Sequence, residues 1–310
     1  MFPALIIALI IFVTEFILGI IANGLIIIVN CTEWISSRKL TCCDMILTSL
    51  GICRFLLHFS IFINIIFFAF STVMDGQCII WIIMYLLWKY LNTLSIWLAT
   101  WLSVFYCVKI ANFGQPLFCW LKQRISRLLP QLLRSSLLLS LISCLFSVSD
   151  IGIWHIDNSM NNLSGNTSME CRYKVHSSAS FAILSMLGYS FLFFIFIVPA
   201  ILLITSLWRH TKRMRKTASS FRDTVTEAHV SAIKCMISFI FFVSYLVAVV
   251  LVLSQMFAHR NICVSCFCIA VMAAYPSGHS VVLILGNPKL KRAALKALNY
   301  VKCRLRDEAS

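Results

Sequence analysis

Long apolar stretches alternate with short polar ones along almost the whole chain. A helix needs about 20 predominantly apolar residues to cross the hydrocarbon core of a bilayer. Seven stretches reach that length, at about 4–30, 43–70, 79–107, 132–154, 180–207, 232–257 and 263–286. We therefore predict an all-α membrane protein, a seven-transmembrane helix bundle that forms one domain over residues 1–310, with a tail at 287–310.

Both ends of the chain carry a pattern of their own. The tail predicts a short amphipathic helix over 288–306, because basic residues surround an apolar face made of Leu290, Ala294, Leu298 and Val301. Palmitoylation of Cys303 and a free thiol there are both compatible with the pattern. The first stretch begins near Met1 without a basic segment before it, so we expect a retained anchor rather than a cleaved leader.

Composition and charge support a membrane protein and orient it. Hydrophobic residues make up 60% of the chain, charged residues 12%, and the mean hydropathy is +0.91, which excludes an ordinary soluble domain. Of the 26 Lys and Arg residues, 19 fall in four segments at 31–40, 108–127, 208–228 and 287–310. Basic loops stay in the cytoplasm, so these segments are predicted inside and the N-terminus outside.

The net charge of +15 is therefore mainly a topology signal and does not predict nucleic-acid binding. The loop at 155–178, predicted to lie outside, carries two N-glycosylation sequons, at Asn162 and Asn166. Of the 14 cysteines, only Cys78 and Cys171 are placed at outer loop ends, and whether they form a disulfide stays open. Spacing typical of a zinc site is absent from the sequence, so no metal and no cofactor are predicted.

Polar residues inside the apolar stretches mark the interior of the bundle, because lipid-facing positions exclude them. Arg54 is the clearest case, since a central Arg costs about 2.5 to 3.5 kcal/mol on insertion scales. We expect it to bond with Asn23 and the backbone of the seventh span rather than with Glu15. The predicted structural polar network consists of Asn23, Arg54, His279 and Ser280.

The third span carries a stripe of aromatic and amide side chains. Tyr85, Trp88, Asn92 and Ser95 recur at spacings of three and four, which places them on one helical face. The stripe fits ordinary interior packing, and it equally fits the wall of a ligand cavity that opens outward. The basic, amphipathic inner ends of the spans fit either contact with anionic lipids or docking of a partner protein.

Several strings together resemble the bitter taste receptors, the type 2 taste receptor family of G-protein-coupled receptors. They run in order from "EFILGIIANG" through "DMILTSLGICRFLLH", "WLATWLSVFYCVKIANF", "LKQRIS", "SLWRHTKRM" and "TEAHVSAIKCMISF" to "YPSGHSVVLILGNPKLKRA". The resemblance covers nearly the whole chain. It implies a receptor for bitter-tasting small molecules, located as a multi-pass protein in the plasma membrane.

The resemblance also implies where ligands bind. Trp88 and Asn92 match third-span positions that contact ligands in the family, which favours the cavity interpretation of the stripe. Two departures stand beside this match: Leu246 occupies the place where a sixth-span tyrosine is expected, next to Tyr245, and Ile269 stands where some members carry a glutamate. The predicted ligand-binding residues are Tyr85, Trp88, Lys89, Asn92, Leu246 and Ile269. With Lys89 present and Ile269 in place of an acid, we expect neutral or acidic agonists rather than cationic ones.

Signalling through a heterotrimeric G protein of the gustducin or inhibitory class, followed by calcium release, is implied as well. The predicted coupling residues are Tyr106, Lys109, Arg213, His229 and Lys234, around an inner cleft. Catalytic motifs are absent from the sequence, so an enzyme is not expected. The alternatives are a chemosensory receptor of another family and a transporter or channel lined by Arg54, Lys89 and His279. Homo- or hetero-oligomerisation stays open.

Overall fold

The computed structural model describes residues 2–70, 78–110, 116–148, 151–154, 172–175 and 262–308, with helical positions between 188 and 208 and between 238 and 248. The elements with defined bounds in these ranges are α1 (Phe2–Ser37), α2 (Cys42–Phe70), α3 (Cys78–Ile110), α4 (Pro116–Val148), β1 (Ile151–Trp154), β2 (Arg172–Val175), α7 (Ile262–Gly286) and α8 (Pro288–Asp307).

Four of the described helices are long and apolar enough to cross a bilayer. The crossing segments are Leu9–Ser37, Cys42–Ile66, Ile82–Lys109 and Phe118–Phe146. Shorter apolar helices at Ser190–Pro199 and Ala270–Gly286 fall within the fifth and seventh predicted spans. These helices confirm the all-α membrane fold that the hydropathy pattern predicts.

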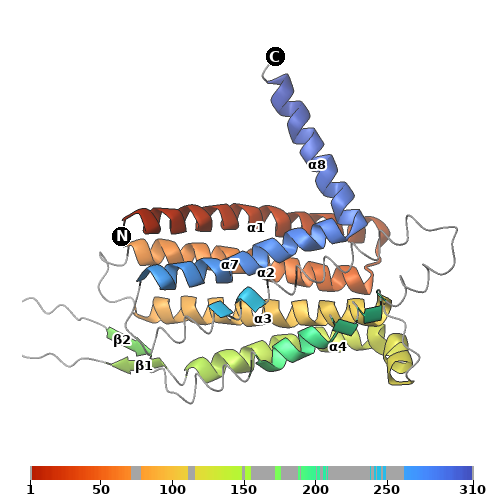
Figure 1. The fold of residues 1–310 in the computed structure, drawn as a ribbon, viewed down its shortest axis with the longest axis horizontal. Coiled ribbons are helices and arrows are strands. Elements are labelled where there is room, and N and C mark those ends of the chain that lie inside the picture. Colours follow the sequence, from red (N-terminus) through yellow and green to blue (C-terminus); the bar gives the residue numbers. More distant parts are fainter. Residues whose placement is uncertain are drawn as a thin grey trace, which may run out of the picture.

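The long helices lie side by side as a bundle (Figure 1). Helix α1 contacts α2 and α7, α2 contacts α3, and α3 contacts α4. Helix α8 projects from one end of the bundle, and the N-terminus lies at the other end (Figure 1). Helix α7 therefore returns beside α1 and α2, which brings segments more than 200 residues apart into contact.

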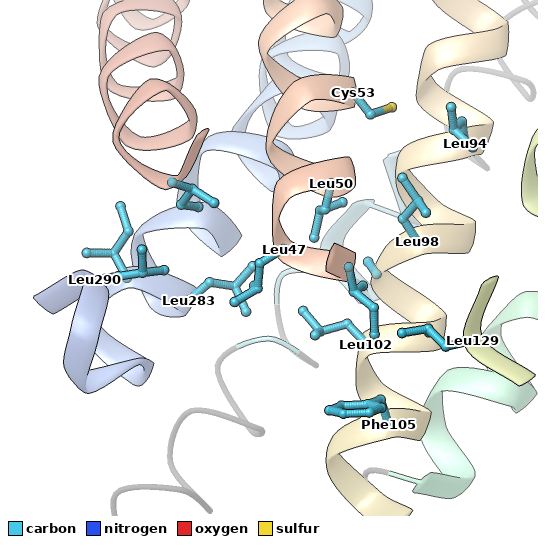
Figure 2. Packing of buried hydrophobic residues seen from close by; sticks show 14 of the residues in the cluster. Leu47, Leu50, Cys53, Leu94, Leu98, Leu102, Phe105, Leu129, Leu283 and Leu290 are labelled. Carbon is cyan, nitrogen blue, oxygen red and sulfur yellow. The ribbon is translucent and has the colours of Figure 1, made fainter. Parts of the chain in front are cut away.

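The core lies where α2 and α3 face each other. Figure 2 shows leucines from α2, α3, α4, α7 and α8 in this cluster, among them Leu47, Leu98, Leu129, Leu283 and Leu290. By contrast, Ile21 and Ile28 of α1 are 64% and 62% exposed, as expected for side chains that face lipid. The surrounding lipid is as apolar as leucine, so close packing rather than exclusion from water stabilises the contacts between the helices in the core.

The fourth predicted span differs from the helix that forms there. Helix α4 begins at Pro116 and ends at Val148, whereas the apolar stretch at 132–154 continues beyond it. Residues Ile151–Trp154 instead form strand β1, which pairs antiparallel with β2 so that Trp154 lies opposite Arg172. The hairpin lies at the same end of the molecule as the N-terminus (Figure 1). A short apolar run predicts a helix or a strand equally well, and here its last residues pair across the loop.

Local chemistry fixes the corner between α7 and α8. The side chain of Asn287 caps α8 by accepting a hydrogen bond from the backbone N–H of Lys289 at 3.0 Å. Pro288 then occupies the first helical turn, where its fixed φ is favourable and its missing N–H costs nothing. The new helix direction therefore begins at a defined residue, and Leu290 is fully buried against the bundle.

Candidate functional site

Arg54 in α2 is fully buried and bonds to two other helices. Its Nε donates to Ser95 Oγ of α3 at 3.1 Å, and its Nη1 donates to Ser280 Oγ of α7 at 3.1 Å. Its Nη2 lies 2.8 Å from Nδ1 of His279. A guanidinium has only donors, so Nδ1 must accept, which requires the neutral His279 tautomer with its proton on Nε2. One side chain thereby connects α2, α3 and α7.

Helix α1 joins this arrangement through Ser280. The Ser280 hydroxyl lies 2.8 Å from Asn23 Oδ1 and also 2.8 Å from the carbonyl of Pro276. A direct bond from Arg54 to Asn23 is expected from the sequence, but in the structure Ser280 connects the two residues. Arg54 also contacts side chains of α7, not the α7 backbone that the sequence predicts. The Oε2 of Glu15 is buried without a hydrogen-bond partner among the described residues.

Aromatic rings extend the arrangement toward the sixth span. The guanidinium carbon of Arg54 lies 5.2 Å from the ring centroid of Tyr275, and Tyr275 stacks on His279 with centroids 5.7 Å apart. The Tyr275 ring is 5.4 Å from that of Tyr245, whose hydroxyl accepts a hydrogen bond from Asn92 Nδ2 at 2.5 Å. We call this continuous set of side chains, from Asn92 through Tyr245, Tyr275, His279 and Arg54 to Ser280 and Asn23, the polar chain.

The stripe of aromatic and amide side chains on α3 begins at Asn92, in the polar chain, and continues toward the N-terminal end of the helix. The rings of Tyr85 and Trp88 are 6.1 Å apart, and Tyr85, Trp88 and Lys89 are all half-buried. Asn92, one turn further along, is buried and reaches Tyr245. The side chains of Leu246 and Ile269, also predicted to bind ligand, lie outside the described residues.

The polar chain includes Tyr245, which is not among the residues predicted to bind ligand. It is fully buried, in a second cluster that contains Ile96, Trp97, Leu192, Phe196 and Tyr275. A phenol inside the apolar run "FFVSYLVAV" is a signal that could have identified Tyr245, because a buried tyrosine hydroxyl needs a hydrogen-bond partner.

At the opposite end of α3, two predicted coupling residues are described. The hydroxyl of Tyr106 lies 3.6 Å from Cys43 Sγ of α2, so this side chain is half-buried between helices. Lys109 is exposed, and its ammonium lies 5.9 Å from the ring centroid of Phe105. The other coupling residues, Arg213, His229 and Lys234, lie outside the described residues.

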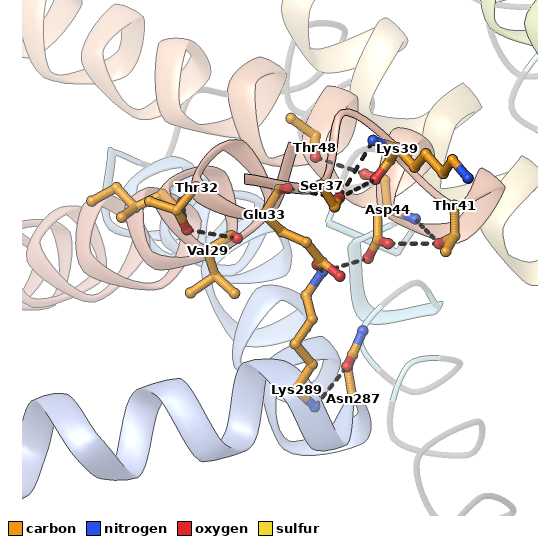
Figure 3. A network of polar contacts seen from close by, with 11 residues as sticks. Val29, Thr32, Glu33, Ser37, Lys39, Thr41, Asp44, Thr48, Asn287 and Lys289 are labelled. Atoms are coloured by element: carbon orange, nitrogen blue, oxygen red, sulfur yellow. Dashed lines mark hydrogen bonds and ion pairs between the residues drawn. The ribbon is translucent and has the colours of Figure 1, made fainter. Parts of the chain in front are cut away.

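The same end holds an ion-pair cluster of Lys289, Glu33 and Asp44 (Figure 3). Lys289 Nζ of α8 contacts Glu33 Oε2 of α1 and lies 2.9 Å from Asp44 Oδ1 of α2, whose other oxygen accepts from Thr41. Partial burial alone would lower the pKa of Lys289, but the hydrogen bonds and charges of both carboxylates raise it overall. The cluster therefore attaches α8 to the ends of α1 and α2.

Comparison with known proteins shows the family. The profile of the taste receptor protein (TAS2R) family matches residues 1–302. The chain belongs to the type 2 taste receptor family. Taste receptor type 2 member 10 of Papio hamadryas is 38% identical over 304 residues, covering 96% of this chain and 94% of that protein. Member 1 of Gorilla gorilla gorilla is 37% identical over 303 residues, covering 96% and 98%, and member 2 of Homo sapiens is 36% identical over 289 residues, covering 92% and 93%.

The family places the chain among G-protein-coupled bitter taste receptors of the membrane and confirms the resemblance read from the sequence. The family is a receptor family. Membership therefore favours a receptor over the alternative of a transporter or channel. Three predicted features of this family member lie outside the described residues: the sequons at Asn162 and Asn166, and Cys171. Cys78 begins α3, but its side chain is likewise outside them.

Proposed function

We propose that this chain is a plasma-membrane receptor that binds bitter small molecules beside Trp88 and Asn92 and activates a gustducin-type G protein, which raises intracellular calcium. One observation carries the proposal. The Asn92 to Tyr245 hydrogen bond links the predicted ligand stripe of α3 to the sixth span, at the start of the polar chain. A ligand that contacts this stripe would therefore lie next to the polar chain, which connects α3 and the sixth span to α7, α2 and α1.

The mechanism follows from linkage. A ligand activates only to the extent that it binds the active arrangement more tightly than the resting one. A bitter molecule that contacts Trp88 and bonds with Asn92 competes with the Tyr245 hydroxyl for the same amide. Changing that bond shifts the position of the sixth span relative to α3, and Tyr275 transmits the change to Arg54 and α7.

Signal output requires the inner end of the bundle. We propose that movement of the sixth span opens a cleft beside α3, in which Tyr106 and Lys109 meet the G protein together with Arg213, His229 and Lys234. Exposed Lys109 and the basic residues expected around it suit an acidic partner surface. The outer end would carry the N-terminus, glycans on Asn162 and Asn166, and the candidate disulfide between Cys78 and Cys171.

The agonist class is part of the proposal. Lys89 lies one residue from Trp88, and Ile269 stands where a carboxylate would serve a protonated amine. Neutral or acidic agonists are therefore preferred over quaternary amines, because a buried cation without an anion loses its hydration uncompensated. A screen in which quaternary amines were the most potent agonists would contradict this preference.

Potency measurements on Asn92 and Tyr245 test the site. Asn92→Leu removes the amide that the ligand would bond with and should lower agonist potency by about threefold to tenfold, whereas Tyr245→Phe removes the competing hydroxyl and should raise potency by a similar factor. The double variant should match Asn92→Leu, because removing the Tyr245 hydroxyl has no further effect once the amide is gone. Trp34→Ala is the control, since Trp34 is 52% exposed on α1 and far along the chain from the stripe.

Each variant is compared at equal surface expression. Additive effects of Asn92→Leu and Tyr245→Phe would show that the two residues act independently. Unchanged potency in all three variants would place the agonist elsewhere in the receptor.

A further inference from the structure

A groove lies in the angle between α1 and α8, apart from the polar chain. It encloses about 600 Å³ and is lined by Val29 of α1 and, around α8, by Asn287, Pro288, Lys289, Arg292, Ala293 and Lys296. The first residues of α8 form most of its wall. Pockets of this size accommodate a ligand of a few tens of atoms.

The lining combines cations with an apolar floor. Arg292 and Lys296 are exposed and four residues apart, so they lie one above the other on the same face of α8. Val29, Pro288 and Ala293 supply apolar surface beside them. The ammonium of Lys289 is already engaged by Glu33 and Asp44, so Arg292 and Lys296 supply the cationic charge for an occupant. A ligand with an anionic group next to an apolar part complements this lining.

The location identifies the source of such a ligand. Val29 precedes Glu33 by about one turn on α1, and Glu33 pairs with Lys289 of α8 (Figure 3). The groove therefore lies at the boundary between the apolar surface of α1 and the charged residues that attach α8. Exposed Ile21 and Ile28 continue the apolar surface of α1 away from it. Exposed Leu298, Val301 and Leu305 on α8 are typical of a helix that lies at a membrane surface.

We propose that the groove between α1 and α8 binds an anionic phospholipid of the inner leaflet. Its phosphate interacts with Arg292 and Lys296, and its acyl chain lies along α1 beside Val29. The lipid would fix α8 against the bundle next to the ion-pair cluster. This site does not depend on the proposed ligand or G protein, since it rests only on the contacts of α1 and α8.

Lipid binding to the purified full-length receptor tests the proposal. Native mass spectrometry would count bound phosphatidylinositol 4-phosphate on receptor prepared with mixtures of that lipid and phosphatidylcholine. Arg292→Gln with Lys296→Gln should lower the affinity by about fivefold for each cation removed. The matched control is Lys302→Gln with Arg306→Gln, which removes the same charges at the same spacing further along α8 and should change the affinity by less than twofold.

A second pair of variants fills the groove without changing charge. Ala293→Trp should reduce lipid binding, whereas Leu295→Trp, about 200° further around α8 and exposed on the opposite face, should not. Equal losses from both charge-removing pairs would show diffuse surface attraction and overturn the site. Full binding by Ala293→Trp would also overturn it. If soluble inositol phosphate bound as tightly as the lipid, the groove would be a phosphate site rather than a lipid site, and the proposal would fail.

Discussion

Replacing Arg54 by alanine should lower the free energy of unfolding by about 3 to 5 kcal/mol, because three buried polar groups lose their charged donor. The substitution deletes hydrogen bonds of 3.1, 3.1 and 2.8 Å to Ser95, Ser280 and His279. It also deletes the contact with the Tyr275 ring. Both losses occur at a side chain that is fully buried.

The magnitude follows from opposing contributions. Hydrogen bonds to a charged group are each worth about 1.5 to 3 kcal/mol, so three of them give about 4.5 to 9 kcal/mol. Removing the guanidinium returns its desolvation penalty, which is several kcal/mol for a buried ion. The net loss is still large, because the polar groups of α3 and α7 stay buried after their donor is gone. Arg54→Lys should fall between wild type and Arg54→Ala, since one ammonium cannot reproduce the guanidinium fork.

A double-mutant cycle in detergent micelles measures the central bond directly. Unfolding would be followed by the fluorescence of the 8 tryptophans during titration with a denaturing detergent. Arg54→Ala and Ser280→Ala should couple by about 1.5 kcal/mol or more. Ser136→Ala is the matched control, because Ser136 is equally buried but accepts its hydrogen bond from Trp101. Its effect should add to that of Arg54→Ala within about 0.5 kcal/mol.

Two results would contradict this role of Arg54. One is an Arg54→Ala receptor as stable as wild type, which would mean that the desolvation penalty cancels the hydrogen bonds. The other is equal coupling of Arg54 to Ser280 and to Ser136, which would mean that the loss reflects general loosening of the bundle.

Further predictions concern the helix contacts and the ion-pair cluster. Gly19→Ala should destabilise the receptor by about 1 to 3 kcal/mol, because its Cβ would overlap the ring of His58, which is buried and has little room to move. Gly24→Ala should be neutral or stabilising, because its Cβ would come no closer than 3.9 Å to its nearest neighbour, Phe55. Similar unfolding midpoints for Gly19→Ala and Gly24→Ala would contradict the close packing of α1 against α2 at Gly19. Lys289→Gln should speed amide hydrogen exchange in α8 by up to about fivefold, and Lys291→Gln on the same helix should not. Because the pKa of Lys289 is raised above its ordinary 10.5, the attachment of α8 should be complete below pH 10.5 and weaken as the pH rises through the raised value; an NMR label on α8 that reports no such loss would contradict it.

The sequence predicts the four full-length membrane helices that the structure describes, but it predicts the end of the fourth span poorly. The length of an apolar stretch decides whether it can cross a bilayer, and this is local information. The last residues of 132–154 join β1 because they pair with residues near 172. That pairing joins residues about 20 positions apart, and the periodicity of apolar residues within one segment carries no information about it.

The site is predictable in kind but not in its contacts. A charged residue within an apolar stretch must have polar partners, so the interior position of Arg54 follows from the sequence. Its actual partners depend on helix rotation, and for that reason Ser280 rather than Asn23 meets the guanidinium. The same limit applies to Tyr245, because its hydrogen bond with Asn92 depends on how the two helices are rotated, which the sequence pattern does not determine. The ion pairs of Lys289 join residues more than 240 positions apart, so the basic tail gives no sign of them.

Calcium release in cells is the measurement that shows whether this family member is a G-protein-dependent receptor for bitter molecules. Cells with and without a gustducin-type α subunit would express the wild-type chain or Trp88→Ala at equal surface levels. Each would be challenged with a chemically diverse panel of bitter compounds. We predict responses only where the α subunit is present, and their loss or strong weakening in Trp88→Ala. Ion currents or solute uptake that persist without any G protein would contradict it.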